Sequence, residues 1–254
     1  MKYGIIGYSG FVGSNLTRQH PFDYKYNSKN IRDIEGKEIG LLILAAPSAS
    51  MWVANQDPDG DKKIIDGILE NISKSKTKRI VYLSTVAVYD KTSSVNEDSE
   101  IDGDKITAYG RNRLYLEKEI LHNYPGSLIV RLPGLFGTGL KKNYIYDMKE
   151  TGESPWTNEN SVYQFYNLEN AWKDISLALK NGLKTLNITS EPVSVKEVAR
   201  ECFGKDFTNK KEAPLFNYDI KTIYDEIFGG KEGYIYSKKD ILFDIKRFIG
   251  SEMK

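Results

Sequence analysis

The feature that most constrains the fold is a glycine pattern near the start of the chain. Gly7, Gly10 and Gly13 recur in the stretch GYSGFVG, directly after the short apolar run Tyr3–Ile6 and at the opening of a helical segment. In such a turn one glycine permits the tight bend, one lets the backbone approach a pyrophosphate, and one allows close packing of helix on strand. The helix N-terminus adds free N–H groups and a positive dipole end. The pattern predicts a dinucleotide site; a tight turn without a ligand is the alternative. The expected contacts are Gly7, Ser9, Gly10, Phe11, Val12 and Gly13.

Short apolar runs alternate with longer segments of helical periodicity through the first two-thirds of the chain. Helices are expected over Ile64–Ile72 and over about 107–122, where the sequence Tyr124-Pro125-Gly126 then stops the helix. Strands separated by helices are typical of a parallel sheet covered on both faces, and so of a Rossmann-type, doubly wound α/β fold. The main strands are expected at Tyr3–Ile6, Leu41–Ala45, Ile80–Ser84 and Ser127–Leu132.

The pattern changes beyond Phe136. Residues 137–163 are polar and irregular and predict a long loop. A strand at Ser161–Asn167, a helix at about 168–179 and a strand at Leu186–Ile188 follow, and Ser194-Val195-Lys196-Glu197 has the form of a capping box that opens another helix. We therefore expect a dinucleotide-binding domain over residues 1–135. Residues 136–254 then form a substrate-binding region with a small α-rich C-terminal cap, partly interleaved with the first domain.

The second strand decides which dinucleotide is preferred. An Asp or Glu at its end, roughly 20 residues past the glycines, would bind a free ribose 2′-hydroxyl. Here the strand, at about Asp23–Tyr26, is followed by Asn27, Ser28 and Lys29. Ser28 and Lys29 suit a 2′-phosphate, which favours NADP over NAD. A solvated loop face is the alternative for Lys29.

Composition excludes several classes of protein. The formal net charge is +1, from 36 Lys+Arg against 35 Asp+Glu, so no basic surface for nucleic acid is expected. One Cys and two His provide neither a disulfide nor a zinc site, and no metal is expected. No apolar run is long enough to span a membrane, and the N-terminus lacks the features of a signal peptide. A cytoplasmic globular protein is the expectation.

Four motifs, in order, carry a resemblance to a known family. They are the glycine pattern, Ser84-Thr85-x-x-Val88-Tyr89, Tyr109-x-x-x-Arg113, and Arg131-Leu132-Pro133-Gly134-Leu135-Phe136-Gly137. In this order they resemble the extended short-chain dehydrogenase/reductase superfamily, in its NAD-dependent epimerase/dehydratase branch, over most of the chain. The resemblance implies further cofactor contacts at Ala45, Ala46, Pro47, Ser84, Tyr109, Arg113 and Pro133.

The resemblance also implies catalytic roles. Tyr109 exchanges a proton with a substrate hydroxyl, and Thr85 hydrogen-bonds the reacting oxygen and the tyrosine. The superfamily normally has lysine where this chain has Arg113, and arginine keeps the charge but not the compact geometry of an ammonium. Glu117, one turn further along, has the spacing to pair with Arg113, although a routine surface contact is an equal alternative. The departure leaves three outcomes open: an active enzyme, reduced activity, or nucleotide binding without turnover.

The substrate expected by resemblance is a nucleotide-sugar or a related carbohydrate. The residues expected to contact it are Thr85, Val86, Gly134, Lys141, Lys142, Asn143 and Gln164. The two lysines suit a diphosphate, although solvated loop charges explain them equally well. Aromatic residues such as Tyr163 and Trp156 offer stacking surfaces, or simply belong to the core.

We therefore expect an NAD(P)-dependent oxidoreductase or epimerase that uses Tyr109 as acid/base. The motifs do not separate reductase from epimerase. Dehydration is disfavoured, because Val86 and Ala87 stand where dehydratases of this branch have an Asp-Glu pair. The competing hypothesis is a non-catalytic NAD(P)-binding or redox-sensing protein. By analogy, the helix that carries Tyr109 is expected to form a homodimer interface.

Overall fold

The computed structural model describes residues 1–48, 50–209 and 212–252 of the chain. The chain divides into two compact units, and each unit combines separate stretches of sequence. The first contains Met1–Asp90, Glu100–Arg131 and Ala171–Leu186, and the second contains Lys91–Ser99, Leu132–Asn170 and the chain from Asn187 on.

A six-stranded sheet forms the centre of the first unit, with strand order β12-β8-β6-β4-β1-β2. Strand β1 pairs in parallel with both β2 and β4, and β4 pairs in parallel with β6. The order reverses at β1, so the sheet is wound in two directions and confirms the predicted doubly wound α/β fold. The strands are β1 (Tyr3–Ile6), β2 (Tyr24–Tyr26), β4 (Leu41–Leu44), β6 (Ile80–Thr85), β8 (Leu128–Leu132) and β12 (Thr185–Asn187). A small parallel pair, β3 (Glu38–Ile39) with β5 (Lys76–Thr77), lies outside this sheet.

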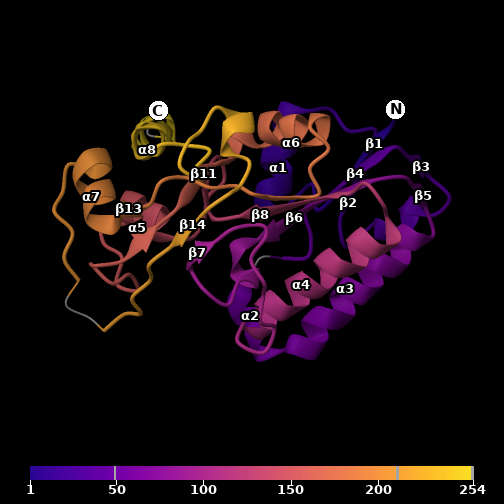
Figure 1. Cartoon of the computed structure of the whole chain (residues 1–254), viewed down its shortest axis with the longest axis horizontal. Coiled ribbons are helices and arrows are strands. Elements are labelled where there is room, and N and C mark those ends of the chain that lie inside the picture. Colours follow the sequence, from indigo (N-terminus) through magenta and orange to yellow (C-terminus); the bar gives the residue numbers. More distant parts are fainter. Residues whose placement is uncertain (49, 210–211, 253–254) are drawn as a thin grey trace. The chain divides into compact units, whose positions relative to one another are not determined.

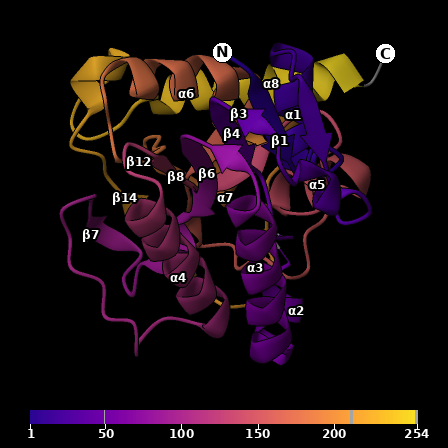
Figure 2. The same ribbon diagram turned by 90° about the vertical axis from the view of Figure 1, so that its right-hand side faces the viewer.

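Helices cover both faces of this sheet (Figure 1). Helices α1 (Phe11–Gln19) and α6 (Ala171–Lys180) pack together on one face, and α3 (Pro58–Ser73) and α4 (Ala108–Asn123) pack together on the other. Figure 2 shows α3 and α4 running side by side. The shorter helical segments of the unit are η1 (Ile31–Ile34), α2 (Met51–Gln56) and η2 (Val86–Val88).

The core explains why these segments take these structures. All four residues of β4 are buried, as a strand covered by helices on both faces requires. On the α3–α4 side the core combines side chains from β4 and β6 with the apolar faces of α3 and α4. Its members include Leu42, Leu44, Ile65, Ile68, Ile72, Ile80, Tyr82, Leu116 and Ile120.

The second unit contains short strands and three helices within the described residues. Strand β9 pairs in parallel with β11, β7 pairs with β14, and β10 pairs with β13. The strands are β7 (Ser93–Val95), β9 (Gly134–Phe136), β10 (Val162–Tyr163), β11 (Phe165–Asn167), β13 (Val193–Ser194) and β14 (Asp219–Ile220). The helices are α5 (Tyr144–Glu150), α7 (Val195–Phe203) and α8 (Lys238–Glu252), with short 3₁₀ turns η3 (Leu168–Asn170) and η4 (Asp225–Phe228).

Two polar side chains, the partly buried Glu97 and the buried Gln164, hold the second unit together. Glu97 accepts hydrogen bonds from the Asn187 N–H, the Thr222 hydroxyl and the Ile223 N–H, and burial raises its pKa. Gln164 bonds the Ser190 carbonyl and both backbone groups of Ile220. Each side chain therefore ties together backbone segments that are distant in sequence.

Three expectations about the second half of the chain need comment. The capping box at Ser194 is confirmed, since the Ser194 side chain and that of Glu197 cap each other's backbone N–H. The expectation of a long loop over residues 137–163 is wrong, because Asn143 caps a two-turn helix, α5, within it. The expected strand Ser161–Asn167 is split into β10 and β11 at Gln164, whose buried amide bonds to neighbouring segments. Within the described residues, no helix is long and apolar enough to cross a membrane.

Candidate active site

The glycine turn between β1 and α1 is dictated by close backbone contacts. Gly7 has φ +89°, and a Cβ there would lie 2.3 Å from the Ala45 carbonyl oxygen. A Cβ at Gly13 would lie 2.1 Å from the Gly7 carbonyl oxygen. These two positions require glycine for the fold itself.

Gly10 is different. A Cβ there would meet only the Gly7 carbonyl oxygen, at 3.3 Å, so the fold places a weaker demand on this position. Gly10 is the N-cap of α1 and offers no side chain to cap it. The first turn of α1 is therefore open toward any group that approaches from outside, with its N–H groups and the positive end of the helix dipole. Ser9 and Gly10 are exposed, and Phe11 and Val12 are partly exposed.

The register of the sheet brings the predicted cofactor contacts of three strands to one edge. Ile6 pairs with Leu44 and with Tyr26, and Leu44 pairs with Tyr82. The residues after these strands therefore emerge at the same carboxyl edge, where open α/β sheets bind their ligands. They are Gly7 after β1, the partly exposed Ala45, Ala46 and Pro47 after β4, and Ser84 and Thr85 at the end of β6.

A tight turn follows β2. The Asn27 side chain accepts a hydrogen bond from the Lys29 N–H at 2.9 Å and donates one to the Tyr8 hydroxyl at 3.3 Å. Ser28 and Lys29 are exposed. Asp23 lies before the strand, where its carboxylate accepts a hydrogen bond from the Tyr3 N–H at 2.7 Å. An amide and a lysine, rather than a carboxylate, thus follow the end of β2.

Helix α4 brings Tyr109 to the end of β6. Thr107 caps the helix by accepting from the Gly110 N–H, and Asn55 of α2 accepts from the Tyr109 N–H at 2.9 Å. A Cβ at Gly110 would lie 2.3 Å from the Ala87 carbonyl oxygen, so glycine lets α4 approach η2 closely. The sequence did not single out Gly110, although this glycine directly follows Tyr109 in the motif.

The structure brings Tyr109, Thr85 and Arg113 together. The Arg113 guanidinium lies over the Tyr109 ring, with its central carbon 4.4 Å from the ring centroid. Burial raises the pKa of Tyr109, while the charge of Arg113 and hydrogen bonding with Arg113 and Thr85 act in the opposite direction. A buried phenol beside a cation and a hydroxyl is the arrangement that acid/base use of a tyrosine requires.

Arg113 is held by Asp61 of α3, a residue that the sequence did not single out. The two guanidinium nitrogens Nη1 and Nη2 donate to the two carboxylate oxygens at 2.8 and 3.0 Å, and Nη2 also donates to the Ser48 carbonyl at 3.0 Å. The side chains of Arg113 and Asp61 are only 2% and 10% exposed. The expected i,i+4 pairing of Arg113 with Glu117 is wrong.

Glu117 instead belongs to a second buried network. It accepts from Arg131 of β8 and, at 2.5 Å, from the Ser84 hydroxyl of β6, while Arg131 also donates to the Tyr89 hydroxyl at 2.7 Å. The charge of Glu117 keeps the pKa of Arg131 high despite its burial. Ser84, expected to contact the cofactor, is 5% exposed and its hydroxyl proton is used within this network.

The expected substrate contacts fall in both units. Val86 lies in η2 of the first unit, whereas Gly134 begins β9 in the second. Pro133, an expected cofactor contact, lies between β8 and β9. The amides of Asn143 and Gln164 are engaged: Asn143 bonds the Leu135 carbonyl and the Tyr146 N–H, and Gln164 has the backbone bonds described above. Lys141 and Lys142 are exposed.

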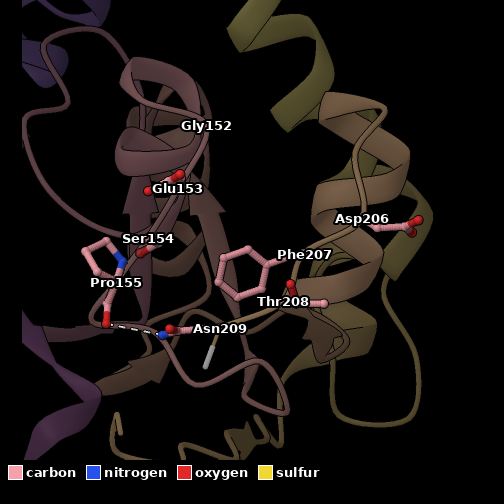
Figure 3. Close-up of a pocket in the computed structure, with 8 residues that line it drawn as sticks. All are labelled: Gly152, Glu153, Ser154, Pro155, Asp206, Phe207, Thr208 and Asn209. Atoms are coloured by element: carbon pink, nitrogen blue, oxygen red, sulfur yellow. Dashed lines mark hydrogen bonds between the residues drawn. The ribbon is translucent and has the colours of Figure 1, made fainter. Parts of the chain in front are cut away.

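A hollow of about 410 Å³ lies in the second unit, between the loop after α5 and the segment after α7 (Figure 3). The Phe207 ring faces the Ser154–Pro155 side, where Asn209 donates to the Pro155 carbonyl, and the Asp206 carboxylate points away. None of the described lining residues is basic, although the Lys205 ammonium lies next to Gly152 at its edge. The lining residues are Gly152, Glu153, Ser154, Pro155, Asp206, Phe207, Thr208 and Asn209.

Solved structures share this fold, although no protein-family model and no curated protein matches the sequence. A UDP-glucose 4-epimerase from Thermotoga maritima has a TM-score of 0.76 at 14% identity, over 100% of this chain and 99% of that chain. A dTDP-4-dehydrorhamnose reductase from Clostridium acetobutylicum has a TM-score of 0.77 at 17% identity, over 100% of both chains. MoeE5, solved with UDP-glucose and NAD, has a TM-score of 0.75 at 15% identity, also over 100% of both chains. The chain thus shares its fold with nucleotide-sugar epimerases and reductases.

Proposed function

We propose that this protein is an NAD(P)-dependent oxidoreductase or epimerase that acts on a nucleotide-sugar or a related carbohydrate. One observation carries the proposal: Tyr109, Thr85 and Arg113 gather at the carboxyl end of β6, on the sheet edge that also holds the glycine turn. The nucleotide-sugar epimerases and reductases named above share the fold and support the substrate class.

The residues fit a nicotinamide dinucleotide. Gly7 and Gly13 shape the turn, and Gly10 leaves the first turn of α1 open, as a bound pyrophosphate requires. When bound, the nicotinamide supplies hydride chemistry. The chain's own residues then transfer the proton: Tyr109 accepts it from a substrate hydroxyl during oxidation and donates it back during reduction. Thr85 orients the reacting oxygen, and the Arg113 charge favours the phenolate form of Tyr109.

NADP is the proposed preference. Lys29 and Ser28 are exposed after β2 and are free to bind a 2′-phosphate, whereas an NAD-specific site would have a carboxylate for the ribose hydroxyls. Structures of this fold include one complex with NAD and one with NADPH. The preference is tested by comparing NADPH and NADH affinities of the protein and of Lys29→Ala, which we expect to weaken NADPH binding selectively.

The function is tested with three measurements. Mass spectrometry identifies nucleotides released from the purified protein, titration of intrinsic fluorescence measures NADPH and NADH affinity, and absorbance at 340 nm follows turnover with a panel of UDP- and dTDP-sugars. Epimerisation leaves the absorbance unchanged, so chromatography of the sugar products completes the assay. Absence of nicotinamide binding would refute the proposal.

Tyr109→Phe tests the role of the hydroxyl. General acid/base catalysis contributes about 10²–10⁴-fold, so we expect turnover to fall by that factor while cofactor affinity stays close to that of the native protein. Tyr115→Phe is the matched control, because it removes a hydroxyl from the same helix that bonds Asp66. Equal turnover in the two variants would remove Tyr109 from the mechanism.

The engagement of Arg113 by Asp61 favours a second candidate, a nucleotide-binding protein without turnover. An arginine already bound to a carboxylate and to the Ser48 carbonyl has fewer donors left for a cofactor. The two candidates differ in the assays above, because a sensor binds NADPH but shows no product with any sugar. Under the leading proposal, Arg113→Ala weakens cofactor binding and turnover together.

We also propose that α3 and α4 form a homodimer interface. Ile64 on α3 and Leu121 on α4 are exposed apolar side chains. Light scattering during size-exclusion chromatography measures the mass, and a value of 28.9 kDa for the native protein would contradict the dimer.

A further inference from the structure

The geometry around Arg113 assigns a role to Asp61. Three of the five N–H groups of the guanidinium bond to Asp61 and to the Ser48 carbonyl. The two parallel bonds to the carboxylate fix the plane of the fork, and that plane lies against the Tyr109 ring. A lysine could not be oriented in this way, because its ammonium is a point charge without a plane.

Asp61 is itself fixed. Its carboxylate also accepts from the Asn112 side chain at 2.9 Å, and Asn112 bonds the Pro58 carbonyl at 2.9 Å as well. Asp61 lies in the first turn of α3, where the helix dipole favours a negative charge. The position of the guanidinium is thus set by Asp61 of α3 together with the Ser48 carbonyl, and Asn112 of α4 in turn holds the Asp61 carboxylate.

We infer that Asp61 is a positioning residue: it holds the Arg113 fork against Tyr109 and sets how strongly that cation acts on the phenol. A catalytic role for Asp61 rests on the proposed function, whereas its effect on Tyr109 can be measured without any assumption about the reaction. Asp61 contributes a negative charge beside the cation, which opposes ionisation of Tyr109. The Arg113–Asp61 ion pair therefore stabilises the phenolate form of Tyr109 less than an unpaired cation at the same place would.

The other groups that face Tyr109 are few. They are Thr85 and the fully buried Tyr82 on β6, and Arg113 on α4 itself. The segments α2 and η2, which also pack on α4, carry no titratable side chain. Within the part of the chain that the structure describes, the ion pair near Tyr109 is formed by Arg113 and the Asp61 carboxylate of α3.

The test is a titration of Tyr109 that needs neither cofactor nor substrate. Absorbance at 295 nm follows phenolate formation. Each protein is titrated beside the same protein carrying Tyr109→Phe, and the difference between the two curves is the titration of Tyr109 in that background. The backgrounds are the native protein, Asp61→Asn, Arg113→Lys and Asp66→Asn, with circular dichroism recorded at each pH. Asp66→Asn is the matched control, because Asp66 lies on the same helix and bonds Tyr115 of α4.

We expect Asp61→Asn to lower the Tyr109 midpoint by about one pH unit, since neighbouring charges shift a pKa by about 1–3 units. Arg113→Lys should raise it, because Asp61 draws the ammonium away from the ring. Asp66→Asn should leave it unchanged. If Asp61→Asn does not fold, Arg113→Lys still decides the matter: a midpoint equal to that of the native protein would overturn the inference, as would equal midpoints in the two aspartate variants. Failure of the proposed function is separate and would show as a native protein that binds no NAD(P)H.

Discussion

Gly7 and Gly13 show how a single residue position can be fixed by the backbone around it. Carbonyl oxygens at 2.3 and 2.1 Å from their virtual Cβ atoms leave no space for any side chain. No such steric reason applies at Gly10, where a Cβ would lie 3.3 Å from the Gly7 carbonyl oxygen. The three glycines of one motif thus separate into two that the fold requires and a third, Gly10, on which the fold makes a weaker demand and which is proposed to face a bound pyrophosphate.

Alanine substitutions separate these demands. Gly13→Ala forces the turn apart, and we expect it to destabilise the protein by about 1–3 kcal/mol, the usual effect of overpacking. Gly10→Ala should leave the free energy of unfolding nearly unchanged but weaken NADPH binding at least about tenfold, equivalent to about 1.4 kcal/mol. Urea unfolding and fluorescence titration measure the two effects.

Gly67→Ala is the control for these variants. Gly67 lies within α3 and a Cβ there meets nothing within 4 Å, so we expect a gain of about 0.4–1 kcal/mol. A Gly10→Ala protein with native affinity for NADPH would contradict the reading of the open helix turn as a phosphate site.

The sequence predicted individual residues where the evidence was local. The glycine turn and the pair Tyr109 and Thr85 belong to short motifs. The structure places the glycine turn and Thr85 at the carboxyl edge of the sheet and Tyr109 beside Thr85, while their roles stay predictions. Asp61 has no local signal: it meets Arg113 only because α3 and α4 pack side by side (Figure 2). The wrong pairing with Glu117 arose from helical spacing, which shows that two residues can meet but not that another partner lies closer.

At the scale of elements, α4 is joined to the sheet by the buried network of Glu117. Its carboxylate links α4 to Ser84 on β6 and to Arg131 on β8, so one charged side chain sets the distance between three elements. Both ionic side chains are almost fully buried, at 2% and 7% exposure. Removing one partner of such a pair leaves an uncompensated charge.

We therefore expect Glu117→Gln to destabilise the protein by about 3–5 kcal/mol, since Arg131 stays charged and buried. Glu119→Gln on the same helix, whose carboxylate accepts a hydrogen bond from the nearby Asn123, should change stability by less than about 0.5 kcal/mol. Thermal and urea unfolding measure the difference. Equal stability of the two variants would show that the network does not hold α4 in place.

Element boundaries followed the sequence where hydrophobic periodicity was strong. The strand at Tyr3–Ile6 and the capped helix at Ser194 are as expected, because their signals are contained within one element. Helix α5 was missed since its two turns bury only Tyr144, Ile145 and Met148 among polar neighbours. The break at Gln164 depends on backbone partners at Ser190 and Ile220, which no local pattern reveals.

At the scale of the whole molecule, His20 connects stability to pH. It stacks on Trp172 of α6 at 3.8 Å, with Tyr3 and Phe22 at its edges, and burial lowers its pKa below 6.5. The unfolded chain then binds a proton more readily than the folded protein. The stability that neutral His20 provides is complete above pH 6.5 and is lost as the pH falls from there toward the lowered value.

We expect His20→Phe to flatten the pH dependence of the melting temperature between pH 7.5 and 5.5. His122→Phe, which replaces an exposed histidine at the end of α4, is the control and should keep the native slope. The measurement is differential scanning fluorimetry over this range. Identical slopes in all three proteins would exclude His20 as the origin.

The sheet of the first unit is completed by a strand from late in the sequence. Strand β8 lies beside β12, and between them the chain builds β9, α5, β10, β11 and α6. A ribosome adds about 5–20 residues per second, so β8 has an unpaired edge for several seconds after it emerges. Unpaired edges favour association with other chains, so we expect aggregation to be favoured during this interval. A chaperone that shields a nascent strand edge would act here, before the residues of β12 are translated.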